Sequence, residues 1–290
     1  MHKKNTSVRG QTKVYFRKHV RIFNNEKGWS FILFGAIISI LVCTVVGEKM
    51  FETYDDIKSG FFAIICAAIW IGIFNSIQLI CKERDILQYE YRSGLKITAY
   101  ILSHFRFQAL MCLVQSAILV IAYCVWVDYP TEGVLFPWAI VEYSITIYLV
   151  MVASDAMGLF ISSLVGSPKT VMTTMPFILI LQLIMSGVLF TLSGWSEYIF
   201  YITVSKWGMA AMGSIAGLND TEAFPQKVQK YVDKQVAEQG GQLFTLERVS
   251  EDAYEATGEH LVQIWGILLL FVVVLLVGSI IRLRFIDHEK

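Results

Sequence analysis

The sequence lacks the short motifs that most often carry catalysis or nucleotide binding. It contains neither a GxxxxGK(S/T) pattern nor any Gly-Lys dipeptide, so the chain cannot bind ATP through a phosphate-binding loop. HExxH and GxSxG are also absent, and the five histidines show no spacing that would gather them around a metal. These absences predict a protein without a catalytic site, cofactor or metal ion of its own.

Cysteine is missing from every polar segment. This distribution argues against a disulfide framework or a cysteine-based zinc site, because all five cysteines lie in or beside apolar runs: Cys43, Cys66, Cys81, Cys112 and Cys124. The net charge of +0 favours no class of charged partner, and nucleic acid is not an expected one.

Charge is also missing from long stretches of a chain that is 55% hydrophobic. A membrane-spanning helix needs ~20 mostly apolar residues. Five stretches meet this requirement without a charge: residues 29–47, 60–81, 107–127, 170–196 and 261–281. A sixth, 134–165, is long enough but carries Glu142 and Asp155. No cleavable signal peptide precedes the first stretch, so six retained transmembrane helices are predicted.

The charges between these stretches predict the orientation. Residues 1–27 hold eight Lys/Arg against one acid, which places this end in the cytoplasm by the positive-inside rule. Residues 82–106 hold five Lys/Arg, whereas 193–259 hold ten acids against five Lys/Arg. With six spans every loop falls on the side that its charge favours, and both termini are cytoplasmic.

Two polar segments are expected at the membrane surfaces. Residues 1–28 mix basic and apolar side chains as an interfacial amphipathic helix does, although a solvated basic tail would carry the same charge. Residues 195–212 are aromatic but interrupted by Ser, Glu and Lys, which predicts a re-entrant or interfacial element. Residues 219–258 are expected to form a small polar cap outside.

A charged, tyrosine-rich strip, 81–103, separates two uncharged runs. It cannot lie in hydrocarbon, because each charge at bilayer depth costs ~2.5–3.5 kcal/mol. The strip must lie at the cytoplasmic face, where a soluble partner can push on it.

A few polar side chains fall inside the predicted spans. Asp155 could be a proton or cation relay, or a structural acid hydrogen-bonded to neighbouring hydroxyls. Asn75, with Ser76 and Gln78, could join helices or line a water-accessible cavity. Glu142 is expected to be solvated at the outer interface.

Four pieces of the strip follow in a recognisable order: Glu83-Arg84, Tyr89-Glu90-Tyr91, Ser93-Gly94 and Tyr100-Ile101-Leu102. This order resembles the first intracellular loop of the G-type (White and pleiotropic-drug-resistance) ABC exporter permeases. The resemblance extends along most of the chain, to Ser186-Gly187-Val188-Leu189 and Ser205-Lys206-Trp207-Gly208-Met209.

The resemblance implies an all-α membrane protein with six transmembrane helices. A basic connecting helix would occupy 1–28, the permease domain 29–284 and a cytoplasmic tail 285–290. Within the domain, a coupling helix would lie at 83–94, and a re-entrant segment and cap at 193–259. The family's paired outer-loop cysteines are absent here, so the cap must hold without them.

The resemblance also implies roles for individual residues. Substrate would bind between the second and fifth spans, at Ala68, Ile71, Asn75, Leu179, Ile180 and Leu183. Plain helix packing is the alternative for the apolar members of this set. An exit plug would be formed by Val188 and Leu189, with valine where the family has its first leucine. Coupling to an ATPase would involve Glu83, Arg84, Asp85, Glu90, Tyr91 and Gly94.

The leading hypothesis is therefore the permease subunit of an ATP-driven exporter. A separate ABC ATPase would carry ATP and Mg at the cytoplasmic face, and two permease subunits, identical or different, would move an amphipathic or hydrophobic substrate outward by alternating access. Because separate permease and ATPase chains are common in bacteria, the bacterial plasma membrane is the expected location, with membrane lipids around the protein.

Two other classes remain open at this point. One is an ATP-independent, proton-coupled transporter or channel that uses Asp155. The other is an intramembrane enzyme, for which the sequence offers no paired catalytic residues.

Overall fold

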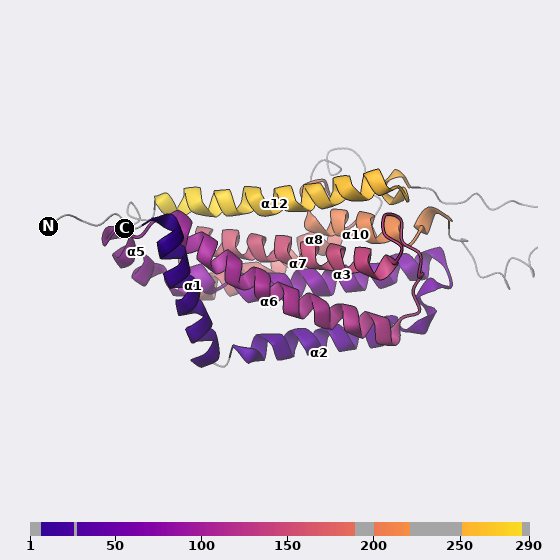
Figure 1. The fold of residues 1–290 in the computed structure, drawn as a ribbon, viewed down its shortest axis with the longest axis horizontal. Coiled ribbons are helices and arrows are strands. Elements are labelled where there is room, and N and C mark those ends of the chain that lie inside the picture. The colour runs from indigo at the N-terminus through magenta and orange to yellow at the C-terminus, as the bar shows by residue number, and fades with distance from the viewer. Residues whose placement is uncertain (1–6, 26–27, 189–199, 221–250, 286–290) are drawn as a thin grey trace, which may run out of the picture.

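The computed structural model describes residues 7–25, 28–188, 200–220 and 251–285, and all regular structure in these ranges is helical. The long helices run side by side in one elongated bundle (Figure 1). Five are long and apolar enough to cross a membrane: α2 (Trp29–Val46), α3 (Tyr54–Ser76) with its continuation α4 (Leu79–Lys82), α6 (Ile97–Trp126), α7 (Ala139–Leu164) and α12 (Gly258–Arg284).

The predicted span at 170–196 corresponds to a shorter helix, α8 (Pro168–Ile184), of 17 residues. Its start is well specified, because the Ser167 hydroxyl accepts a hydrogen bond from the Thr170 amide at 3.2 Å and Pro168 occupies the first turn. Its end is followed by Gly187 in the left-handed conformation, with φ 77°. The helix therefore ends well before residue 196, and residues 189–199 lie outside the described ranges.

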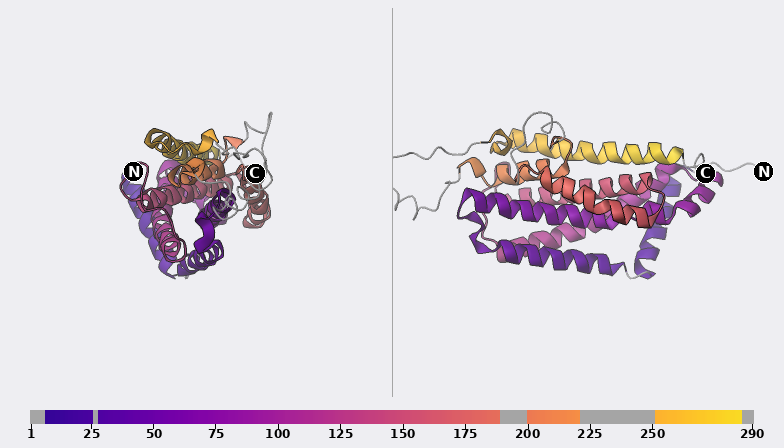
Figure 2. Two further views of the ribbon diagram at one scale, coloured as in Figure 1. Left: turned by 90° about the vertical axis from the view of Figure 1, so that its right-hand side faces the viewer. Right: turned by 180° about the vertical axis from the view of Figure 1, so that it is seen from behind.

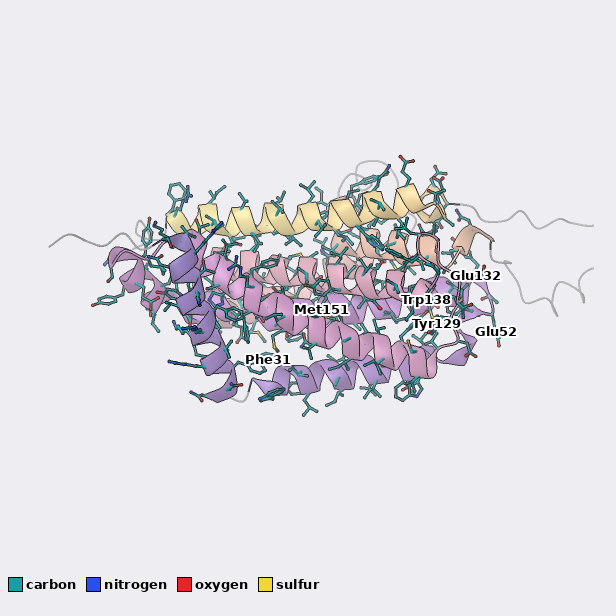
Figure 3. All side chains as sticks on the ribbon, in the orientation of Figure 1. Phe31, Glu52, Tyr129, Glu132, Trp138 and Met151 are labelled. Carbon is teal, nitrogen blue, oxygen red and sulfur yellow. The ribbon has the colours of Figure 1, made fainter. Side chains whose placement is uncertain are left out.

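Two helices predicted to be cytoplasmic lie together at one end of the bundle. They are α1 (Val8–Asn25), which crosses the long helices, and α5 (Arg84–Arg92) (Figures 1 and 2). Glu52, Tyr129 and Glu132 mark the opposite end (Figure 3). We call these the cytoplasmic end and the outer end, after the excess of basic side chains at the first and of acidic side chains at the second.

The centre of the bundle is the contact between α3 and α7. A Cβ atom on Gly72 would collide with the Met151 carbonyl oxygen of α7, and one on Gly158 would collide with the Ser76 hydroxyl. The Ser76 hydroxyl also donates to the Asp155 carbonyl oxygen at 2.7 Å. These small residues let the two spans approach closely, as in other membrane helix pairs.

The expectation that Glu142 is solvated is wrong. Its side chain is fully buried in the first turn of α7, where the backbone amides of Val134, Leu135 and Phe136 donate to it at 3.1, 2.6 and 2.7 Å. The partial positive charge of the helix N-terminus also favours a carboxylate here. Glu142 thus organises the connection that precedes α7.

The predicted re-entrant segment contains helix α10 (Val204–Ile215), which is almost wholly buried in the outer half of the bundle. A Cβ atom on Gly208 would press against Ile65 and Val150, and one on Gly213 would collide with Tyr254. The helix is therefore an integral part of the core and does not lie on its surface. Most of the predicted cap, residues 221–250, lies outside the described ranges.

An outer junction fastens the chain before α12 to the start of α3; we define it as Tyr54, Lys58, Asn219 and Glu251. Glu251 accepts hydrogen bonds from the Lys58 ammonium at 2.6 Å and the Tyr54 hydroxyl at 2.9 Å. The Asn219 side chain bonds both the amide and the carbonyl of Glu251, at 3.1 and 3.0 Å. The acidic segment thus enters at the end opposite to α5.

Candidate functional site

Helix α5 is the predicted coupling helix, and its ends are set by its sequence. Glu83 stands at its N-cap, and Gly94 follows its last residues with φ 106°. The Gly94 amide donates to the Tyr91 carbonyl and the Leu95 amide to the Glu90 carbonyl, both at 3.0 Å. This is a Schellman motif, which glycine favours because it adopts the left-handed conformation without a Cβ penalty. The strip is therefore a short, well-bounded helix.

Glu83 fixes the start of α5 to two other helices. Its carboxylate accepts a hydrogen bond from the Tyr100 hydroxyl of α6 at 3.0 Å and lies 3.5 Å from the Lys18 ammonium of α1. The His104 ring of α6 is 3.6 Å away. Burial raises the pKa of Glu83, but the nearby His104 ring, the Lys18 ammonium and the Tyr100 hydroxyl outweigh it and lower the pKa to about 2.

Glu90 fixes the end of α5 to α1. It accepts a hydrogen bond from the Tyr15 hydroxyl at 2.8 Å, and burial together with this bond raises the pKa of Tyr15. One turn earlier in α1, the Gln11 side chain donates to the Gly94 carbonyl at 3.2 Å and accepts from the Lys96 amide at 2.9 Å. We call this set the cytoplasmic junction: Gln11, Tyr15, Lys18, Glu83, Glu90, Tyr100 and His104.

Arg84 fixes α5 to α7. The residue is buried, and its guanidinium donates to the carbonyls of Ser163 and Val165 at 3.3 and 2.9 Å. These carbonyls close the last turn of α7, where a cation is favoured by the helix dipole. The Ser162 hydroxyl of α7 accepts from the amides of Ile80 and Cys81 at 3.1 Å each, which ties the preceding helix α4 to α7 as well.

The charged side chains expected to form one docking face do not point in one direction. Glu83, Arg84 and Glu90 bind the protein's own helices, and of the four only Asp85 is exposed. Charge placed the strip at the membrane surface, but it did not reveal which side chains turn inward. Tyr91 is partly buried against the core.

The exposed face of α5 includes two residues that were not in the predicted coupling set. Tyr89 is 75% exposed and Ile86 is 54% exposed, on the same side of the helix as Asp85. Their spacing could have revealed them, because Ile86 lies one position and Tyr89 four positions after the surface acid Asp85. Such an exposed mixed face is typical of a protein–protein contact.

The residues predicted to bind substrate are only partly brought together. Ile71 and Asn75 of α3 line one cavity, whereas Ala68 is fully buried in helix packing. On α8, Leu179 is buried and Ile180 is 50% exposed, and neither lines that cavity. Leu183 is half-buried and also lies outside it.

The cavity that contains Asn75 has a wall of amide side chains. The Asn75 and Gln115 amides exchange two hydrogen bonds, at 2.6 and 3.2 Å, and Gln108 donates to the Asn75 carbonyl at 2.7 Å. Gln115 also donates to the Phe31 carbonyl of α2 at 3.1 Å. Asn75 therefore both joins helices through hydrogen bonds and lines a cavity.

Asp155 lies in the middle of α7, facing α3, and is 1% exposed. Its carboxylate oxygens, like the Ser154 hydroxyl, have no hydrogen-bond partner among the described residues. Among the described residues no Lys, Arg or His forms an ion pair with it. Of the predicted exit plug, Val188 is half-buried, with its amide donating to the Ser186 hydroxyl at 3.3 Å, and Leu189 lies outside the described residues.

Comparisons with known proteins agree with this arrangement. A family model described as ABC-2 type transporter matches residues 11–216, which is more than half of the chain and includes α5 with all its anchoring helices. An ABC transporter ATP-binding/permease protein of Mycobacterium tuberculosis is 24% identical over 231 residues, or 73% of this chain. The chain spans 26% of the length of that relative.

The matched region is a permease domain, and no ATPase domain is found on this chain. Five long apolar helices and the family match together identify a multi-pass integral membrane protein. The chain belongs to the ABC-2 type transporter family, of which it supplies a transmembrane permease domain.

Proposed function

We propose that this chain is the permease subunit of an exporter that moves an amphipathic or hydrophobic substrate out of the cell. A separate ABC ATPase carries ATP and Mg and docks at the cytoplasmic end. The observation that carries the proposal is the two-sided character of α5. One side is bonded to α1, α6 and α7, and the other presents Asp85, Ile86 and Tyr89 to the cytoplasm.

The bonds of α5 suit it to transmit a displacement. Glu83 passes a push to α6, Glu90 passes it to α1 and Arg84 passes it to the end of α7. A short helix held at three points moves as a rigid body, because none of its buried polar groups can be released without leaving a partner unsatisfied. Closure of the ATPase on ATP would therefore move several spans together.

Two permease subunits, identical or different, complete the transport path. In each, α8 is the fifth of six membrane crossings, and its exposed side chains include Phe177, Ile180 and Leu181. Ile180 and the neighbouring Leu183 would face α3 of the other subunit across the substrate chamber, with Ile71 and Asn75 on the opposite wall. Val188 and Leu189 would close the chamber toward the outside. Its apolar walls favour a lipid-like, drug-like or peptide cargo.

The ATP-independent alternative has less support. Membership of an ABC transporter family implies a partnering ATPase. Proton coupling would also need a path to Asp155, and neither of its carboxylate oxygens has a hydrogen-bond partner among the described residues with which such a path could begin.

The experiment is reconstitution of the purified permease with its ATPase in vesicles. We expect ATP-dependent movement of an amphipathic fluorescent probe across the membrane, with none when ATP is withheld. Ile71→Trp, which narrows the chamber, should reduce the rate, and Val14→Ala, at an exposed position of α1, should not. Transport of a hydrophilic sugar polymer in place of any apolar probe would refute the proposed cargo class, and transport without ATP would refute the mechanism.

A further inference from the structure

Two cavities meet at the cytoplasmic end of α2. The first, between α1, α6 and the α3–α5 segment, has a volume of about 470 Å³, and the second, between α2 and α3, about 450 Å³. Four residues line both: Phe31, Asn75, Leu79 and Lys82. The cavities are thus adjoining parts of one groove, and each has the size of a small-molecule site. Phe31, at their boundary, is labelled in Figure 3.

The two parts of the groove differ in polarity. The first is lined by five titratable side chains: Lys18, His19, Lys82, Glu83 and His104. Among the described residues that line the second, Lys82 is the only charged one. The remainder of its wall is mostly apolar and aromatic, including Phe34, Ile38, Ile71 and Phe74. A ligand that fills both parts must have a charged end and an apolar end.

The charge available at the polar end is positive. Glu83 is already engaged, with Lys18 at 3.5 Å and the Tyr100 hydroxyl at 3.0 Å. Lys82 is exposed and forms no ion pair with any of the described residues. An anion beside Lys82 would therefore gain a partner without breaking the cytoplasmic junction, and Lys18 lies on the wall of the same cavity.

The position of the groove relative to the membrane selects the kind of anion. Lys82 ends α4 at the cytoplasmic end, where inner-leaflet phosphate groups lie, and the second part runs from there alongside α2. Only 17% of the apolar stretch of α2 is buried in the chain, which leaves most of this helix open to hydrocarbon. Anionic lipids concentrate at such basic cytoplasmic surfaces.

We propose that this groove binds an anionic phospholipid of the cytoplasmic leaflet. The phosphate sits beside Lys82 and Lys18, an acyl chain lies among Phe34, Ile38 and Phe74, and the polar linkage between them faces the amides of Asn75 and Gln115. The inference goes beyond the exporter function, because it concerns a resident lipid on one subunit and needs neither an ATPase nor transport. Ile71 and Asn75 belong to both regions, so a bound lipid would stand next to the proposed substrate chamber.

The test is equilibrium lipid binding to the purified full-length chain, followed by native mass spectrometry. The probes are phosphatidylglycerol, phosphatidylcholine with the same acyl chains, and inorganic phosphate. We expect phosphatidylglycerol to bind more tightly than phosphatidylcholine, and inorganic phosphate to displace neither. Lys82→Gln should weaken phosphatidylglycerol about fivefold and leave phosphatidylcholine unchanged, and Lys82→Arg should restore the preference.

A matched control and a second variant make the result decisive. Lys169→Gln removes a cation that is also exposed at the same end but is not among the residues that line either cavity, and it should have no effect. Ile38→Trp fills the second part and should weaken both lipids. Equal affinity for the two lipids, equal losses in Lys82→Gln and Lys169→Gln, or displacement of the lipid by inorganic phosphate would each overturn the proposal. None of these outcomes bears on ATP-dependent export, which is measured separately.

Discussion

The two ends of the bundle hold a carboxylate in similar ways but with different consequences. At the cytoplasmic end Glu83 has the Tyr100 hydroxyl at 3.0 Å and the Lys18 ammonium at 3.5 Å. At the outer end Glu251 has the Tyr54 hydroxyl at 2.9 Å and the Lys58 ammonium at 2.6 Å. Each carboxylate therefore binds one tyrosine and one lysine.

The difference lies in which elements the partners come from. Both side-chain partners of the Glu251 carboxylate stand in the first turns of α3, and Asn219 holds only the Glu251 backbone, so this carboxylate ties its segment to a single long helix. The partners of Glu83 come from α1 and α6, and α5 is further bonded through Arg84 to α7. The cytoplasmic junction thus distributes a displacement among several helices, whereas the outer junction anchors a loop.

The largest expected effect separates the two carboxylates directly. Glu83→Gln removes the charge that faces Lys18 and His104, and we expect it to lower the free energy of unfolding by about 2 kcal/mol and to abolish ATP-dependent transport. The Glu251 side chain is 38% exposed and better screened, so Glu251→Gln should cost less than about 1 kcal/mol and preserve transport. Thermal unfolding and vesicle transport of both variants provide the measurement, and equal losses would contradict the comparison.

Acidification should weaken the packing of α1 at the cytoplasmic end. Burial, followed by His104 and more weakly Lys18, lowers the pKa of His19 in α1 from 6.5 to about 3, against the opposing charge of Glu83. Below pH 6.5 the unfolded chain therefore binds more protons than the folded one. As the pH is lowered, the free energy of unfolding decreases by up to ~1.4 kcal/mol per pH unit. The corresponding contribution of Glu83, whose pKa is lowered from 4.5 to about 2, is lost only below pH 4.5.

The measurement is the unfolding midpoint at pH 7.5 and pH 5.5. Wild-type protein should be less stable at the lower pH, and His19→Gln should remove most of that dependence while retaining a hydrogen-bonding group near Ser103, which lies 3.3 Å from the His19 ring. A dependence that is the same in both proteins would exclude His19 as its source.

The sequence predicted the spans better than the site, because apolar length is a local property and side-chain partnership is not. The predicted span at 170–196 extends beyond the end of α8 at Ile184. Nothing in an apolar run shows that Gly187 turns the backbone left-handed. Glu142 was misjudged for a similar reason: its partners are loop amides that converge only when the chain folds.

The coupling helix shows the same limit. The sequence marked Glu83 and Glu90 as important, yet the Tyr15 that binds Glu90 is 75 positions away and no periodic pattern connects them. The orientation of a charged side chain on a surface strip depends on such distant partners. The family resemblance correctly identified the permease, while the division of α5 into an inner and an outer face required the structure.

A smaller effect tests whether the end of α5 must be rigid. Gly94→Ala places a Cβ on a residue with φ 106°, which should cost about 1 kcal/mol and loosen the link to α6. Gly166→Ala is the matched control, because this glycine also lies near the cytoplasmic end and a Cβ there meets nothing within 4 Å. Transport should fall in Gly94→Ala and persist in Gly166→Ala. Transport that persists in Gly94→Ala but falls in Gly166→Ala would show that rigidity at Gly94 is not required.

The smallest expected effect concerns the middle of the bundle, between the two junctions. Asp155→Asn preserves the shape of a side chain whose carboxylate has no partner among the described residues, so stability should change by less than about 0.5 kcal/mol and ATP-dependent transport should continue. A proton-coupled mechanism predicts complete loss of transport in this variant, and that result would restore Asp155 to a central role.

The most direct test compares the two faces of α5 by measuring ATPase co-purification and transport in the same preparations. The outward variant is Ile86→Ser combined with Tyr89→Ala, and the inward variant is Arg84→Gln. If α5 binds the ATPase with one face and transmits its movement through the other, the outward variant loses the ATPase, whereas the inward variant retains it but no longer transports. Retention of the ATPase by the outward variant, together with its loss from the inward one, would contradict the account.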